Sequence, residues 1–152
     1  MTLSLRTLYR VPAAVLRETF SELRRCGRGK QECQVLWTSP WDNVPAIDRV
    51  VHPRHHARGD GFDLDGAWLT EFWKELTATR SGIRVQIHTH PDRAFHSATD
   101  DGWPIIHSPG FLSLVIPQFA TGPEGFVSAY LAELREDASW QEVSVRERME
   151  IV

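Results

Sequence analysis

Residues 83–91 read Ile83-Arg84-Val85-Gln86-Ile87-His88-Thr89-His90-Pro91. The first five alternate apolar and polar residues, which is the pattern of a half-buried β-strand. In a strand, residues two apart point to the same face and lie roughly 6.6 Å apart. We therefore predict a strand over residues 83–87 that runs directly into two histidines, His88 and His90, whose side chains can converge on one ion.

The rest of the chain predicts helices and strands around this segment. Periodicity and turn residues predict helices over Val11–Leu23, Gly66–Thr79 and Ser97–Ile106, and strands over Glu32–Thr38, Ala46–Val51, Phe111–Ile116, Phe126–Leu131 and Val143–Val145. Loops are expected over His52–Asp65 and Pro117–Gly125, and a charged tail from about Asp137. This order of elements predicts a layered α/β domain.

Composition narrows the class of protein. The 152 residues, 41% hydrophobic and 24% charged, fit a single domain over residues 1–152. The net charge of −3 argues against nucleic-acid or anionic-membrane partners, and no apolar run approaches the ~20 residues that span a bilayer. Two cysteines, Cys26 and Cys33, are too few for a disulfide framework or a four-cysteine zinc site. We expect a reduced, cytoplasmic protein.

A second segment, Ser97-Ala98-Thr99-Asp100-Asp101, lies just beyond the histidines. Ser97 and Asp100 are three residues apart, so at a helix start they share one face and can point back at the strand. Zinc favours imidazole and carboxylate ligands, and catalytic sites use three protein ligands plus a water. His88, His90 and Asp100 are therefore candidate ligands. The alternatives are two solvent-facing or hydrogen-bonded histidines and a helix cap formed by Ser97 and Asp100, although a cap and a ligand are not exclusive roles.

Together these residues resemble the signature of the JAMM (MPN+) zinc metalloprotease family: Glu, a long gap, His-Ser/Thr-His-Pro, a short loop, then Ser-x-x-Asp. The resemblance covers about residues 11–131 and is nearest to the stand-alone prokaryotic JAB-domain branch. Glu32 occupies the place of the glutamate. The resemblance implies a single-domain MPN (cytidine-deaminase-like) α/β fold, in which a mixed β-sheet is flanked by helices.

The sequence departs from the family pattern at two places. Six residues, not the usual seven, separate His90 from Ser97, so that the usual interval would place the carboxylate at Asp101. We retain Asp100 because a helical turn fixes its spacing from Ser97, whereas a loop loses one residue at little cost. Gln34 and Val35 stand where the family often has a glycine.

The resemblance also implies a mechanism and a substrate class. Zn²⁺ would be held by His88, His90 and Asp100, with Glu32 as the acid–base group and Ser97 as hydrogen-bond donor to the oxyanion. The scissile bond would follow the C-terminal tail of a ubiquitin-like or sulfur-carrier-like protein, and any activating or conjugating enzyme would be a separate chain. The loops 52–65 and 117–125 are candidate binding segments for that tail. The alternatives are a catalytically silent scaffold that binds a partner, and a zinc amidase acting on a small molecule.

The remaining chemically active residues have simpler interpretations. His52, His55 and His56 could form a second metal site or a phosphate patch, but a solvated loop is the preferred reading. His96 neighbours the proposed site and could orient substrate, but it is most simply a surface loop residue. Cys33 is not expected to be a nucleophile beside the histidines, because adjacent strand residues point to opposite faces; if Glu32 faces the metal, Cys33 faces away from it.

Overall fold

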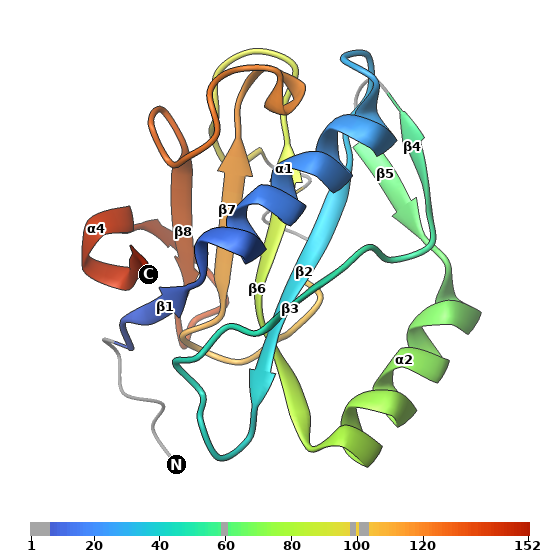
Figure 1. Ribbon diagram of the computed structural model, residues 1–152, viewed down its shortest axis with the longest axis vertical. Coiled ribbons are helices and arrows are strands. Elements are labelled where there is room, and N and C mark those ends of the chain that lie inside the picture. The colour runs from blue at the N-terminus through green and yellow to red at the C-terminus, as the bar shows by residue number, and fades with distance from the viewer. Residues whose placement is uncertain (1–6, 59–60, 98–99, 101–103) are drawn as a thin grey trace.

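The computed structural model describes residues 7–58, 61–97, 100 and 104–152, and its centre is a six-stranded mixed sheet (Figure 1). The strand order is β3-β2-β6-β7-β8-β9; β6 and β7 run parallel and the other neighbours are antiparallel. The elements are β1 Tyr9–Val11, α1 Ala13–Gly27, β2 Gln34–Pro40, β3 Arg49–Val51, β4 His55–Arg58, β5 Gly61–Leu64, α2 Gly66–Thr79, β6 Ser81–Thr89, β7 Leu112–Ile116, the 3-10 helix η1 Gln118–Ala120, β8 Tyr130–Leu134, β9 Trp140–Glu142, α4 Val145–Arg148 and β10 Met149–Ile151.

Each face of the sheet carries its own apolar cluster. Alternation along β2 sends Val35 and Trp37 into the cluster that α1 covers, and Leu36 into the cluster that α2 covers. Helix α1 contributes Phe20 and other residues of its apolar stripe to the first cluster, and lies across the sheet in Figure 1. Helix α2 spans the predicted residues and packs Phe72 and Leu76 on the second cluster. The predicted mixed sheet flanked by helices is therefore present.

Several predicted elements have different bounds for local reasons. Val11 belongs to β1 and not to the first helix, because Pro12 at the helix start favours an extended residue before it. The strand predicted over 46–51 is confined to β3. The strand predicted over 126–131 begins only at Tyr130, which pairs with Val115, after a turn closed by the Ala129 amide and the Phe126 carbonyl.

Two predicted loops contain regular structure, and one predicted helix is shorter. The loop 52–65 holds the hairpin of β4 and β5, and the loop 117–125 holds η1. Of the helix predicted over 97–106, Asp100 is helical and residues 104–106 are not; residues 98–99 and 101–103 lie outside the described part. Pro104 opposes helical continuation, and the Ile105 amide donates to Gln86 Oε1 instead.

The charged C-terminal segment is part of the fold, which therefore extends beyond residues 11–131, the part of the chain that the family resemblance covers. Strand β9 pairs with β8, and β10 pairs in parallel with β1; the predicted strand 143–145 is replaced by the turn into α4. Tyr9 and Met149 are both buried in the cluster beneath α1. Among the described residues, no helix is both long and apolar enough to cross a bilayer.

A buried ion pair fastens this segment to the sheet. Glu133 of β8 pairs with Arg148 of α4 and, at 3.0 Å, with Arg135, and both Glu133 and Arg148 are buried. Removing one partner of a buried ion pair leaves the other charge buried without an opposite charge. We expect Arg148→Ala to lower the free energy of unfolding by about 3 kcal/mol, measured by urea denaturation. Arg146→Ala, an exposed change on the same helix, should stay within about 0.5 kcal/mol; equal small losses would contradict this role for the pair.

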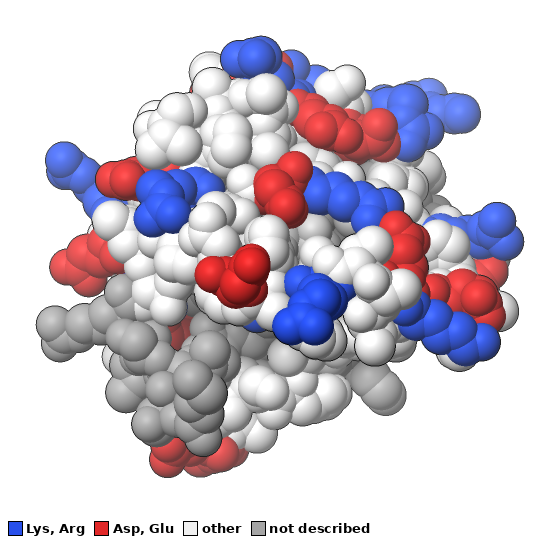
Figure 2. All heavy atoms as spheres, turned by 60° about the horizontal axis from the view of Figure 1, so that its bottom comes forward, with Lys and Arg blue, Asp and Glu red and all other residues white. Residues whose placement is uncertain are grey.

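Charged side chains of both signs are interspersed on the face drawn in Figure 2. That face carries no broad basic field, in keeping with the net charge of −3. The expectation that nucleic acid is not a partner stays a prediction.

Candidate metal centre

His88 and His90 lie at the C-terminal end of β6, in the middle of the sheet. His88 is paired with Gln34 of β2 on one side and with Val115 of β7 on the other. The His90 amide continues the ladder by donating to the Ile116 carbonyl over 3.0 Å. Both imidazoles are almost fully buried, at 1% and 3% exposure. The strand thus holds two histidines on one face, as the spacing predicted.

Asp100 comes from the next turn of the chain and meets both rings. One carboxylate oxygen, Oδ2, lies 3.2 Å from His88 Nε2 and 3.1 Å from His90 Nε2. One ligand atom from each of the three residues lies within 4.8 Å of the others. The sequence predicted these three residues as a set, and the structure brings them together. Asp101 lies outside the described residues.

Ser97 fixes the position of Asp100 through a reciprocal pair of hydrogen bonds. The Ser97 amide donates to Asp100 Oδ2 over 2.9 Å, and the Asp100 amide donates to Ser97 Oγ over 3.1 Å. This is the pattern of a capping box. Asp100 makes the capping contact and faces both histidines at the same time, so a cap and a candidate ligand position are compatible here.

The electrostatics of the three residues set their protonation. Burial opposes the charge on Asp100, but hydrogen bonds from His88 and His90 outweigh it, so the pKa of Asp100 lies well below its usual range. Burial, the largest influence, lowers the pKa of the His88 imidazole, and the neighbouring Asp100 offsets this only in part. At neutral pH the carboxylate is therefore ionised and His88 is neutral, which are the forms that bind a metal.

The distances also fit a tetrahedral metal ion. Two donor atoms that share an ion at 2.0–2.2 Å in tetrahedral geometry lie about 3.3–3.6 Å apart. The two nitrogen–oxygen separations of 3.1 and 3.2 Å are slightly shorter than that edge, so a small outward shift of the side chains would accommodate an ion. Two imidazoles and one carboxylate leave a fourth position open. The residues present can hold a divalent metal with room for a water or substrate atom.

Glu32 lies two residues before Gln34, at the entry to β2, and is 8% exposed. The ladder continues past the strand end, because the Thr89 amide donates to the Cys33 carbonyl and the Cys33 amide to Thr89 Oγ1. Since Gln34 opposes His88, this register places Glu32 opposite His90 and on the same face. Cys33 lies on the other face, in the cluster beneath α1, as alternation predicted. The catalytic role of Glu32 stays a prediction.

Sequence reasoning did not predict the polar and aromatic contacts of His96 near the candidate ligands. His96 is half-buried, its Nε2 lies 3.1 Å from Ser113 Oγ, and its ring packs against Trp140 with centroids 4.6 Å apart. Gln86 donates to the same hydroxyl over 3.1 Å. His96 lies in a loop, as predicted, but it is held by these contacts and is not a fully exposed surface residue. No local pattern marks this contact, because Ser113 and Trp140 reach it only through the pairing of β6, β7, β8 and β9.

The segment 117–125 packs against the loop that follows His90. The Phe119 amide donates to the His90 carbonyl over 2.8 Å, and the Gln118 amide donates to the Asp92 carbonyl over 2.9 Å. Arg24 of α1 holds the segment from the other side, donating to the Ala120 and Gly122 carbonyls over 2.8 Å each. The segment therefore supports the position of His90.

Loss of the Arg24 contacts should loosen this support. We expect Arg24→Ala to lower the free energy of unfolding by about 1–2 kcal/mol, since two charge-assisted hydrogen bonds are lost at a partly exposed site. Hydrogen exchange should speed up at the amides of residues 118–121. Arg25→Ala is the matched control, because Arg25 is exposed and pairs with Glu22 on the same helix. Similar exchange in the two variants would rule out the support by Arg24.

The two cysteines also depart from expectation, because the structure joins Cys26 to Cys33 in a disulfide with a Cα–Cα distance of 6.0 Å. His52 and His55 lie against the two sulfurs. These two histidines are therefore not simply part of a solvated loop.

Comparison with known proteins gives one relative of substantial identity. No protein-family model matches the chain. A protein of Sinorhizobium fredii (strain NBRC 101917 / NGR234), named probable metalloprotease y4jG, is 47% identical in an alignment 135 positions long, and the match covers 81% of this chain and 79% of that protein.

Solved structures share the fold at low identity. A protein of Desulfitobacterium hafniense has a TM-score of 0.71 at 15% identity, over 95% of this chain and 93% of its own. A JAB1/MPN domain protein of Archaeoglobus fulgidus has a TM-score of 0.55 at 10% identity, over 96% and 98%. A protein of Salinibacter ruber has a TM-score of 0.57 at 15% identity, over 91% and 90%. At these identities the likeness shows the fold alone.

Proposed function

The chain belongs to the MPN/JAMM family of metalloproteases, and from that premise we propose that it is a zinc-dependent isopeptidase or peptidase. Its proposed target is the bond that follows the C-terminal tail of a ubiquitin-like or sulfur-carrier-like protein. The observation that carries the proposal is the buried group of His88, His90 and Asp100, with Glu32 on the same face. A cytoplasmic location is part of the proposal.

His88, His90 and Asp100 would hold the zinc, which supplies Lewis acidity toward a carbonyl oxygen and a water. Glu32 accepts a proton from the attacking water and returns it to the leaving amine. Ser97 Oγ accepts a hydrogen bond from the Asp100 amide, and its own hydroxyl proton can therefore be donated to the developing oxyanion. Metal binding, proton transfer and oxyanion stabilisation are thus each assigned to named residues of this chain.

An extended tail would bind by strand addition, which requires a free strand edge. Strand β6 lies between β2 and β7 and offers none. Strands β4 and β5 pair in a separate two-stranded sheet, so each keeps an outer edge. The segment 117–125 is held by Arg24 and by the loop after His90. Of the two candidate segments, we favour the hairpin of β4 and β5 as the docking edge.

Purified protein should be incubated with a ubiquitin-like or sulfur-carrier protein that bears a peptide after its tail, and separately with small amides. We expect cleavage of the fusion directly after the tail, loss of activity with a chelator, and recovery with zinc. Binding of the fusion without cleavage would instead indicate a silent scaffold. Turnover of small amides alone would indicate a small-molecule amidase.

A further inference from the structure

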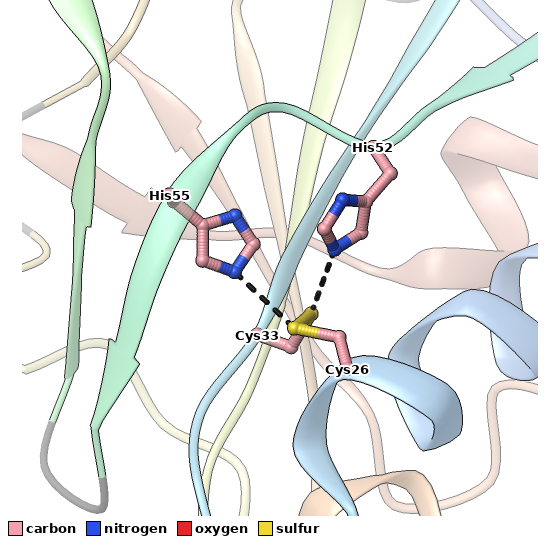
Figure 3. A group of neighbouring side chains, drawn as sticks. All are labelled: Cys26, Cys33, His52 and His55. Carbon is pink, nitrogen blue, oxygen red and sulfur yellow. Dashed lines mark hydrogen bonds between the residues drawn. A yellow bond between two sulfur atoms is a disulfide. The ribbon is translucent and has the colours of Figure 1, made fainter.

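Four metal-binding side chains meet at a second place, where α1, the sheet and the β4–β5 hairpin adjoin (Figure 3). Cys26 lies in the last turn of α1 and Cys33 directly before β2; His52 follows β3 and His55 begins β4. One ligand atom from each lies within 4.8 Å of the others. None of these four residues has a part in the proposed hydrolysis.

Each histidine points a ring nitrogen at one sulfur, as Figure 3 shows. His52 Nε2 lies 3.4 Å from Cys33 Sγ, and His55 Nε2 lies 3.3 Å from Cys26 Sγ. These separations are of the size expected between neighbouring donor atoms on one tetrahedral ion, given zinc–sulfur bonds near 2.3 Å and zinc–nitrogen bonds of 2.0–2.1 Å.

The other nitrogen of His55 is already in use. Its Nδ1 lies 2.9 Å from the Pro53 carbonyl oxygen, so in the neutral ring Nδ1 carries the proton and Nε2 presents a lone pair. A hydrogen bond from the non-ligating nitrogen to a backbone carbonyl is the usual support of a metal-binding histidine. A disulfide sulfur has no proton to offer that lone pair, so in the disulfide form the neutral ring and Cys26 face each other as two acceptors.

We propose that Cys26, Cys33, His52 and His55 form a second zinc site, of the structural type, in the reduced chain. Two thiolates and two imidazoles fill a tetrahedral ion completely, whereas the group of His88, His90 and Asp100 leaves one position open. The disulfide is the oxidised form of the same pair. A dithiol reductant supplies two electrons and two protons to give two thiols, and zinc binding then displaces those two protons.

The site would link the β4–β5 hairpin to α1 and to the start of β2. Strands β4 and β5 form a two-stranded sheet apart from the main one, and an isolated hairpin is marginally stable in water. His52 and His55 bracket the entry to this hairpin, while Cys26 and Cys33 bracket the connection from α1 to β2. The spacings, Cys-x6-Cys and His-x2-His, differ from those of zinc fingers. The four ligands come from four places in the fold: the end of α1, the start of β2, the end of β3 and the start of β4.

Metal content of the full chain tests the proposal. The protein is expressed with zinc, purified under a phosphine reductant, desalted and analysed for metal and free thiols. We expect about two zinc ions per chain, falling by one ion in Cys26→Ser and in His55→Ala. His88→Ala should lose the other ion, and His107→Ala, at an exposed histidine, should retain both. This pattern separates the second site from the proposed catalytic one.

Cobalt binding tests the same proposal on the unaltered protein, so the result does not depend on whether a variant folds. Reduced, metal-free protein is titrated with Co²⁺. A sulfur-to-cobalt charge-transfer band is expected, because the second site contains thiolates and the group of His88, His90 and Asp100 does not. A reduced wild-type protein that holds one zinc, gives no such band and keeps its zinc in Cys26→Ser would overturn the proposal. Iron and sulfide at this site, with visible absorbance, would also overturn it in favour of an iron–sulfur centre.

Discussion

Replacing His88 by alanine is expected to remove one zinc ion per chain and to reduce hydrolysis to the level of the chelator-treated protein. His88 is 1% exposed and supplies one of three candidate ligand atoms. Without its imidazole, one histidine and one carboxylate remain, which is fewer than the three protein ligands of catalytic zinc sites. Zinc content and the cleavage rate should be measured on the same preparation.

The control for this variant is His107→Ala, in which an exposed histidine is removed. It should retain both the metal and the activity of the unaltered chain. Because His88 is buried, circular dichroism and a thermal melt must show that the alanine variant is folded. A folded His88→Ala protein that keeps its full zinc content and activity would remove His88 from the site.

Replacing Glu32 by glutamine is expected to preserve the zinc and to lower kcat by about 10²–10⁴-fold, the range that positioned acid–base groups contribute. Glutamine keeps the size of the side chain but cannot accept and return a proton. The register of β2 against β6 places Glu32 beside His90 without making it one of the three grouped ligands. Metal analysis and steady-state kinetics on the tail fusion would measure the two effects separately.

Glu18→Gln, an exposed change on α1, is the matched control and should leave both quantities unchanged. Loss of zinc together with activity in Glu32→Gln would make Glu32 a ligand or a structural residue. Full activity in that variant would exclude it from the mechanism.

The three candidate metal ligands could be predicted because their relative positions depend on short stretches of sequence. His88 and His90 are fixed by the two-residue period of a strand, and Asp100 by one helical turn from Ser97. The family resemblance built on these residues is confirmed by the 47% identical relative, and the fold that it implies by the likeness to solved structures. That one Asp100 oxygen makes the capping contact and also faces the histidines could not be read from spacing alone.

Features that depend on distant pairing were not predictable in the same way. The start of β8 at Tyr130 follows from its register with Val115, which no local pattern encodes. The role of the charged tail in the fold was not predicted, because its strands are three residues long and β1, the partner of β10, lies at the other end of the chain. The Glu133–Arg148 pair joins residues that each look solvated in sequence.

The second cluster illustrates the same limit. The four side chains lie at separate places in the sequence, with spacings that match no zinc-finger pattern: Cys26, Cys33, His52 and His55. The two cysteines and the two histidines come together only because α1 packs on the sheet and β3 pairs with β2. A histidine-rich loop alone is compatible with a solvated surface, so the sequence favoured that reading.

The most direct test of the metal centre is anomalous diffraction at the zinc edge from crystals of the zinc-loaded protein. We expect a peak bonded to His88 Nε2, His90 Nε2 and an Asp100 carboxylate oxygen at about 2.0–2.2 Å. A map in which these three side chains are ordered, with zinc bound elsewhere and none between them, would contradict it.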